Sequence, residues 1–257
     1  MKFKFLSLAK FSGFAVIAAA LQLVSSAQQA PSRPLSADRP DSTESPYTVP
    51  AGRFQIESSF AAFTQDDHAD GHAESWVFAE TNFKFGLSEN TDLQLVVAPY
   101  VYEREAADGD VTGVGDFGDL TLRFKWNLWG NDEGSSALGL LPWVKIPVQT
   151  EVSNGRWEGG LIVPFAYELT ERISLGCQFE VANLYDETAD QYWALGHTLV
   201  LGFSLTDQLG MYVEYAGSAS EVPYEASASG GLTYLVHDDL QLDTGLLVGL
   251  NDDTRDF

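Results

Sequence analysis

Cysteine and basic residues are scarce in this sequence, and each shortage excludes a class of protein. The 257 residues contain one cysteine, Cys177, so no disulfide can form within the chain. Only 14 Lys and Arg stand against 37 Asp and Glu, which gives a formal net charge of −23 at pH 7. Because nucleic-acid binding requires a basic surface that neutralises phosphates, we expect no nucleic-acid partner.

Long apolar runs are also missing. The run at residues 14–24 is too short to cross a bilayer as a helix. Three Lys residues precede it and Ser-Ser-Ala follows it, which is the layout of a secretory signal peptide. We therefore predict a signal peptide over residues 1–27 and no transmembrane helix after it.

Signatures of catalysis are not present either. Hydrolysis by a nucleophile requires a nucleophile beside a base and an orienting acid, and none of the four His residues lies in such a motif. No nucleophile-elbow, zinc or nucleotide-binding pattern occurs. His197 falls on the apolar face of a predicted strand, at a local bulge or a membrane interface. We expect no enzymatic activity and no cofactor.

What the sequence has in abundance is alternation of polar and apolar residues. In residues 118–129 (GDLTLRFKWNLW), Leu120 to Leu128 place apolar side chains on one face and charged side chains on the other. This is the period of a β-strand whose two faces meet different surroundings. The pattern recurs in segments of about ten residues, long enough to cross a bilayer when tilted. Eleven strands are predicted, beginning near residues 53, 76, 91, 118, 137, 160, 173, 192, 209, 226 and 240.

The connections between these strands alternate in length. Short polar turns, such as Ser88-Glu89-Asn90, alternate mostly with longer acidic loops. The predicted long loops are residues 64–74, 103–117, 150–158, 186–191 and 217–225. This arrangement is typical of outer-membrane barrels. The sequence therefore predicts an all-β protein, a transmembrane antiparallel up-and-down β-barrel over residues 51–257, located in the outer membrane.

The number of predicted strands is odd, whereas such barrels close with an even number. We expect about twelve strands, with the last one missing from this chain. The alternatives are that residues 28–50 supply a strand or that the count is wrong. Residues 28–50 are rich in Pro, Ser and charge and cannot pair continuously in a sheet. They are interpreted as an exposed N-terminal tail or as a plug in the mouth of the barrel.

If the polar faces of the strands enclose a lumen, charges of both signs line it. They could set the transverse field of a pore. They could equally pair with one another and fill a small barrel that does not conduct. The predicted lining residues are Arg53, Glu57, Glu80, Lys84, Asp119, Arg123, Lys125, Lys145, Glu180, Glu214 and Asp243.

Two loops resemble ligand sites only weakly. Residues 66–74 (DDHADGHAE) combine carboxylates and imidazoles that could hold a divalent cation. An acidic solvated loop is the better interpretation, so no metal site is predicted. Residues 113–119 are rich in Gly, but no Lys-Ser/Thr pair follows, so they are interpreted as a bend that leads into a strand.

Residues 39–60 (RPDSTESPYTVPAGRFQIESSF) resemble the opening of a family of outer-membrane transporters named for the meta-pathway of phenol degradation. Residues 113–116 (GVGD), 145–147 (KIP) and 249–252 (GLND) add to the resemblance. In similar proteins another strand follows the Gly-Leu-Asn segment. The resemblance implies a role in transport and defines the substrate class only loosely.

These observations predict an outer-membrane channel or transporter for passive uptake or efflux of small, aromatic or hydrophobic molecules. Arg123 and Lys125, together with Glu57, Glu80 and Glu214, are expected to line the path. The expected partners are outer-membrane lipid, a small-molecule solute and the barrel-assembly machinery. The alternatives are a structural or cation- or polysaccharide-binding barrel without transport, a membrane-embedded enzyme that uses His197, and a soluble secreted β-protein.

Overall fold

The computed structural model describes residues 33–68, 71–107, 110–186, 190–220 and 224–251. The predicted signal peptide, residues 1–27, and residues 28–32 lie outside this part. Fifteen strands are found in the described residues, and all of their pairings are antiparallel. The prediction of an all-β antiparallel fold is therefore confirmed. Within the same residues, no helix is long and apolar enough to cross a membrane.

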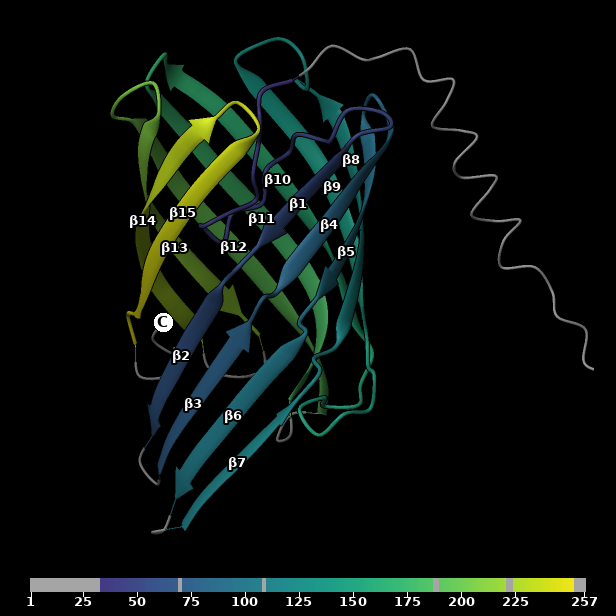
Figure 1. Cartoon of the computed structure of the whole chain (residues 1–257), viewed down its shortest axis with the longest axis vertical. Coiled ribbons are helices and arrows are strands. Elements are labelled where there is room, and N and C mark those ends of the chain that lie inside the picture. The colour runs from purple at the N-terminus through teal and green to yellow at the C-terminus, as the bar shows by residue number, and fades with distance from the viewer. Residues whose placement is uncertain (1–32, 69–70, 108–109, 187–189, 221–223, 252–257) are drawn as a thin grey trace, which may run out of the picture. The chain divides into compact units, whose positions relative to one another are not determined.

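The strands form two sheets (Figure 1). An eleven-stranded sheet has the order β1-β4-β5-β8-β9-β10-β11-β12-β13-β14-β15, and a four-stranded sheet has the order β2-β3-β6-β7. The bounds are β1 (Phe54–Ser58), β2 (Ala61–His68), β3 (Gly71–Phe78), β4 (Thr81–Ser88), β5 (Thr91–Val97), β6 (Tyr100–Ala107), β7 (Asp110–Asp116), β8 (Leu120–Trp129), β9 (Ser136–Ile146), β10 (Glu158–Thr170), β11 (Ile173–Asp186), β12 (Asp190–Ser204), β13 (Leu209–Ala219), β14 (Glu225–His237) and β15 (Leu240–Gly249).

The count of fifteen exceeds the predicted number because the first four long strands are each interrupted once. Ser58 pairs with Thr81 in one sheet and Ala61 with Phe78 in the other, so the register is the same on both sides of the break. Across the break, the Ser59 N–H donates to the Glu80 carbonyl at 2.9 Å. β1 and β2 therefore continue one line of chain, as do β3 and β4, β5 and β6, and β7 and β8.

Two of the predicted long loops are wrong. Most of residues 64–74 belongs to the β2–β3 hairpin, and most of residues 103–117 to the β6–β7 hairpin. Alternation did not reveal these strands because polar residues occupy both of their faces, as in Glu103-Arg104-Glu105. Pairing of backbone amides, which does not depend on side-chain polarity, extends the sheet here.

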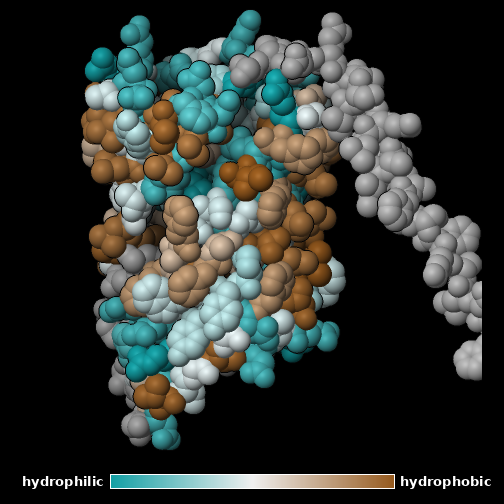
Figure 2. All heavy atoms as spheres, in the orientation of Figure 1, coloured by the Kyte–Doolittle hydropathy of each residue, from teal (hydrophilic) through white to brown (hydrophobic). Residues whose placement is uncertain are grey.

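The eleven-stranded sheet has an apolar outer face and a polar inner face. On β8, Phe124 and Trp126 of the outer face are 37% and 44% exposed, whereas Lys125 of the inner face is 1% exposed. Lys125, Gln94 and Asp92 are among the largest fully buried side chains. Figure 2 shows hydrophobic side chains spread over the strands, with hydrophilic ones gathered at the top and near the lower end. This distribution is the reverse of a soluble core.

Residues 33–50 form neither helix nor strand and lie against the inner face. In Figure 1 this purple segment passes between β1, β4 and β5 in front and β10 to β12 behind. Among the described strand pairs, β1 pairs only with β4 and β15 only with β14. Since ten antiparallel steps separate β1 from β15, these two edges run in the same direction.

Candidate functional site

The candidate site is the polar inner face of the sheet together with residues 33–50, which we call the N-terminal segment. From the sequence, this region is interpreted as either an exposed tail or a plug. In the structure its polar groups bond to at least six strands of the sheet, from β1 to β15.

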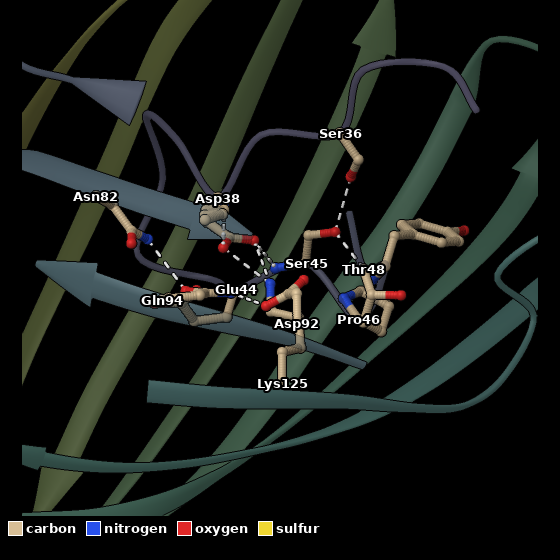
Figure 3. A network of polar contacts seen from close by, with 12 residues as sticks. Ser36, Asp38, Glu44, Ser45, Pro46, Thr48, Asn82, Asp92, Gln94 and Lys125 are labelled. Carbon is tan, nitrogen blue, oxygen red and sulfur yellow. Dashed lines mark hydrogen bonds and ion pairs between the residues drawn. The ribbon is translucent and has the colours of Figure 1, made fainter. Parts of the chain in front are cut away.

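Asp38 lies at the centre of the site. Its carboxylate accepts hydrogen bonds from the Lys125 ammonium, at 2.8 Å to each oxygen, and from the Lys84 ammonium. Lys84 also pairs with Glu57, and both Lys side chains are at most 2% exposed. Figure 3 shows Asp38 and Lys125 pointing toward one another across the interior. Removing either partner would leave an unpaired charge away from water.

A second group holds the end of the N-terminal segment. The Val49 N–H donates to the Asp92 carboxylate at 3.0 Å, and Gln94 donates to the other oxygen of Asp92 at 2.9 Å. Gln94 in turn accepts a hydrogen bond from Asn82 at 3.1 Å. These side chains extend the network along β5 and β4 (Figure 3).

The middle of the segment is held from two sides. Arg123 donates to the Glu44 carboxylate at 2.6 Å. On the opposite wall, Glu214 accepts bonds from the Ser42 N–H at 2.9 Å and from the Thr43 hydroxyl at 2.6 Å. The segment therefore connects β8 to β13 through its own side chains and backbone.

Arg39 lies at the seam between the first and last strands. Its guanidinium donates to the Ser59 hydroxyl, next to the end of β1, at 2.7 Å and to Asp243 of β15 at 3.3 Å. At the start of the segment, Arg33 pairs with Asp132 at 2.6 Å, but Asp132 is 57% exposed. Arg39 therefore joins the edges of β1 and β15, which do not pair through their described backbones, whereas the pair between Arg33 and Asp132 is a surface ion pair.

Glycines of the wall leave room for the N-terminal segment. A Cβ on Gly139 of β9 would lie 3.2 Å from the Pro46 Cα and 3.3 Å from Pro164. A Cβ on Gly86 of β4 would overlap the Val49 and Pro50 carbonyls. The backbone of the segment thus approaches the wall so closely that a side chain at Gly86 would clash and one at Gly139 would be crowded.

The carboxyl groups of the segment titrate differently from one another. Burial opposes ionisation of Asp38, but Lys125 and Lys84 hold its pKa well below the ordinary value. Burial and the nearby Glu214 raise the pKa of Asp41 to about 7. Burial and Asp38 also raise the pKa of Glu44, although Arg123 opposes the shift.

The predicted lining residues fall into three groups. Glu57, Lys84, Arg123, Lys125, Glu214 and Asp243 surround the N-terminal segment and bond to it or to one another. Lys145 pairs with Glu158 at 3.0 Å and Asp119 at 3.5 Å, while Glu180 accepts a bond from the Trp143 indole. Arg53 and Glu80 are exposed, and no described residue forms an ion pair with either.

Sequence reasoning did not identify Asp38, Glu44, Asp92 or Trp143 as site residues. The first two lie in a segment without periodicity, so no pattern placed them next to particular strands. The available signal was charge complementarity, because Lys84, Arg123 and Lys125 require acidic partners if they face an interior. Asp92 and Trp143 fall on the polar faces of the alternating strands predicted to begin near residues 91 and 137.

Open space remains on both sides of the N-terminal segment. A cavity of about 600 Å³ is lined by Trp143, Glu180 and residues of β11 to β14. A second, of about 930 Å³, lies between the segment, β1 and β15. Neither holds a metal cluster, since the described residues contain no group of three or more His, Cys, Asp or Glu arranged to bind a metal ion.

His197 lies beside aromatic side chains on the sheet. It lies in β12 opposite Phe179 and Gly217, in a register without a bulge. Its ring stacks on Tyr224, whose hydroxyl is 3.2 Å from His197 Nε2. This arrangement fits packing at the surface of the sheet, and within the described part of the chain no Ser, Thr or Cys side chain bonds to the imidazole.

Comparison with protein families places the chain in a known family. The model of a family described as "Putative MetA-pathway of phenol degradation" matches residues 37–257, which include the N-terminal segment from Ala37 onward and all fifteen strands. No curated protein matches the chain.

Proposed function

Because the chain belongs to this phenol-degradation MetA-pathway family, we propose that it is an outer-membrane channel for small solutes. In this proposal the eleven-stranded sheet is the wall of a transmembrane up-and-down β-barrel. The N-terminal segment is its plug, and passage is passive, without energy coupling. The solute class is small and aromatic or hydrophobic.

The distribution of exposed apolar side chains supports a membrane location. The outer face carries exposed aromatic and aliphatic residues on β8 and on every strand from β10 to β15, such as Trp126, Phe179 and Leu246. Phe179 and Leu246 are 69% and 64% exposed. Soluble proteins expose single apolar residues, but rarely a continuous apolar surface over several strands. Lipid would cover this face, and the polar interior would then contain the only wet surface of the wall.

A twelfth strand between β15 and β1 completes the proposal. A barrel in lipid must pair every strand edge, and β1 and β15 run in the same direction. One further strand, antiparallel to both, satisfies this requirement and gives an even count. The cavity of about 930 Å³ lined by Gln55, Glu57 and Gln241 lies at this seam.

The main support for the plug is the pairing of cations of the wall with carboxylates of the N-terminal segment. Lys84 and Lys125 meet Asp38, and Arg123 meets Glu44. The charges predicted to line a pore are therefore occupied in this state. Solute passage requires the segment to move, or requires a solute small enough to pass through the cavities beside it.

Planar-bilayer conductance and liposome swelling test the proposal directly. Purified full-length protein should conduct weakly, and a variant lacking residues 33–50 should conduct several-fold more strongly. The variant's β content and heat-modifiable migration serve as the control for folding. Absence of permeability in both proteins would overturn the channel.

A structural barrel is the second candidate, because the N-terminal segment fills much of the interior and satisfies its charges. Such a barrel would interact with outer-membrane lipid and with cations or polysaccharide at its acidic loops, without transport. The same experiment separates the two proposals, since a structural barrel stays impermeable when residues 33–50 are removed.

A further inference from the structure

The cavity beside Trp143 has an unusual lining. It measures about 600 Å³ and includes Ser42 from the N-terminal segment as well as wall residues. Small residues such as Ala182, Ala194 and Ala216 make up much of the wall. Two carboxylates, Glu180 and Glu225, also line it, and none of its described lining residues is Lys or Arg.

Trp143 and Glu180 form a paired unit within this cavity. The Trp143 indole N–H donates to Glu180 Oε1 at 2.7 Å. Trp143 lies opposite Gly160 in the sheet, and Glu180 lies opposite Gly196. A Cβ on Gly160 would be 2.9 Å from the indole nitrogen, so this Gly permits the indole to lie across β10 toward β11.

Gly196 makes room for Glu180, the other member of the pair. A Cβ at this position would lie 3.3 Å from the Glu180 Cβ and 3.5 Å from Glu180 Oε2. The carboxylate therefore rests against β12, with Oε1 bound to the indole and Oε2 beside Gly196. Glycines on β10 and β12, the two strands that flank β11, thus accommodate one aromatic–carboxylate pair.

The nearest cations of the wall are already engaged. Arg123 is opposite Trp143 in the sheet, but its guanidinium is bonded to Glu44 of the N-terminal segment at 2.6 Å. Lys145 is held by Glu158 at 3.0 Å. No described Lys or Arg nitrogen lies within 4 Å of the Glu180 carboxylate. Glu180 is therefore a half-buried carboxylate that forms no ion pair with a described residue, and Arg123 attracts it only from beyond contact distance.

We propose that this cavity binds an organic cation, a small compound that carries an ammonium group on an apolar body. A carboxylate in a partly desolvated site favours a positive charge. An indole attracts cations to its ring face, and small apolar residues accommodate a hydrocarbon body. The volume is within the range of small-molecule pockets.

Two other ligand classes fit less well. A hard divalent cation takes six to eight oxygen ligands, whereas this cavity offers two carboxylates beside an indole and alanines. An anion would face Glu180 and Glu225 with no Lys or Arg in the lining to compensate. The organic cation is thus the class that the lining favours.

This site deepens the proposed function, and its role as a step in transport rests on that proposal. Binding itself does not require conduction. Isothermal titration calorimetry on the full-length protein in detergent should use three probes of similar size, namely benzylamine, benzyl alcohol and benzoate. Benzylamine should bind about tenfold more tightly than benzyl alcohol, and benzoate should not bind.

Glu180→Gln is the decisive variant, because Gln retains the shape and can still accept the indole hydrogen bond. It should reduce benzylamine affinity to that of benzyl alcohol. Glu168→Gln, at a residue of β10 outside this cavity, is the matched control and should leave the affinity unchanged. Trp143→Phe should weaken benzylamine several-fold while both variants keep the β content of the parent.

Equal binding of the three probes would overturn the site, as would unchanged benzylamine affinity in Glu180→Gln. Displacement of benzylamine by submillimolar Ca²⁺ would also overturn it, in favour of a metal site. Conductance without benzylamine binding would refute this site and leave the channel. Benzylamine binding without conductance would refute the channel and leave this site.

Discussion

At the scale of single residues, the inner face depends on charges that meet only because the N-terminal segment brings its carboxylates to the wall. Asp38 contacts two Lys side chains that are almost completely buried. The sequence allowed the cations of the wall to be predicted, since alternation placed Lys84, Arg123 and Lys125 on the polar face. Their partners could not be predicted from the sequence. Asp38 is 46 positions from Lys84 and 87 positions from Lys125, and ion pairs over such separations leave no local pattern.

Asp38→Asn tests the central ion pairs. Docking of the N-terminal segment should weaken by about 3–5 kcal/mol, because two buried ammonium groups lose their shared carboxylate. Thiol labelling of Val49→Cys in a Cys177→Ser background reports docking, since Val49 is 6% exposed. The labelling rate should rise steeply in Asp38→Asn. Asp132→Asn, which breaks the exposed pair with Arg33, should change docking by less than about 1 kcal/mol.

If Asp38→Asn and Asp132→Asn gave the same labelling rate, the buried pairs would not hold the segment. The same result would remove the main support for the plug.

The pKa of Asp41 predicts a pH dependence of docking. The docked group has a pKa of about 7, against an ordinary value of 3.8. Between these values the docked carboxyl keeps its proton while the released one is ionised, so docking weakens as pH rises from about 4 to 7. The lowered pKa of Asp38 has the opposite effect. Docking weakens when the pH falls below 3.8, the ordinary pKa of Asp, because the released carboxyl then takes up a proton more readily than the docked one. Docking should therefore be tightest near pH 4–5.

Labelling of the Val49→Cys reporter, normalised at each pH to an exposed cysteine, measures this profile. Asp41→Asn should reduce the change between pH 4.5 and 7, to which the raised pKa of Glu44 also contributes, and leave the acid limb intact. A profile that kept its full slope in Asp41→Asn would assign the titration to another group.

At the scale of secondary-structure elements, the strands could be predicted from the sequence, but the interruptions within them could not. Period-2 alternation located the lines of chain that make up the eleven-stranded sheet. It did not locate the breaks after β1, β3, β5 and β7, where the register continues although the strand geometry lapses. Ala79, with φ of 55°, lies at one of them. A backbone in this conformation depends on tertiary context, which alternation does not report.

Gly139→Val tests the fit between β9 and the N-terminal segment. The new side chain would meet Pro46 and Pro164 and should displace the segment from the wall. We expect faster labelling of the Val49→Cys reporter and higher conductance, with unchanged β content. Leu140→Val, on the outer face of the same strand, should leave both measurements as in the parent. Slow labelling in Gly139→Val would show that the segment is not seated on this Gly.

The seam between β1 and β15 makes its own prediction. If a twelfth strand pairs with both edges in the membrane, the outward amides of β1 and β15 should exchange hydrogen as slowly as those of β11. Hydrogen exchange of the protein in lipid vesicles, read by mass spectrometry, would measure this. Fast exchange confined to Phe54–Ser58 and Leu240–Gly249 would mean that the edges stay open.

At the scale of the whole molecule, the notable property is a polar interior enclosed by a sheet with an apolar exterior. Lys125 and Asp92 are each 1% exposed, while Phe54 and Phe179 are 72% and 69% exposed. This inversion could be predicted from the recurrence of alternation. The occupancy of the interior by residues 33–50 could not, since a Pro-rich segment is compatible with a tail as well as with a plug.

Heat-modifiable migration in the outer-membrane fraction tests the membrane barrel most directly. Because a closed barrel resists detergent until it is heated, the account predicts a protein that is recovered with outer membranes and migrates differently before and after boiling. Recovery in the soluble fraction, with a single band that heating does not move, would contradict it.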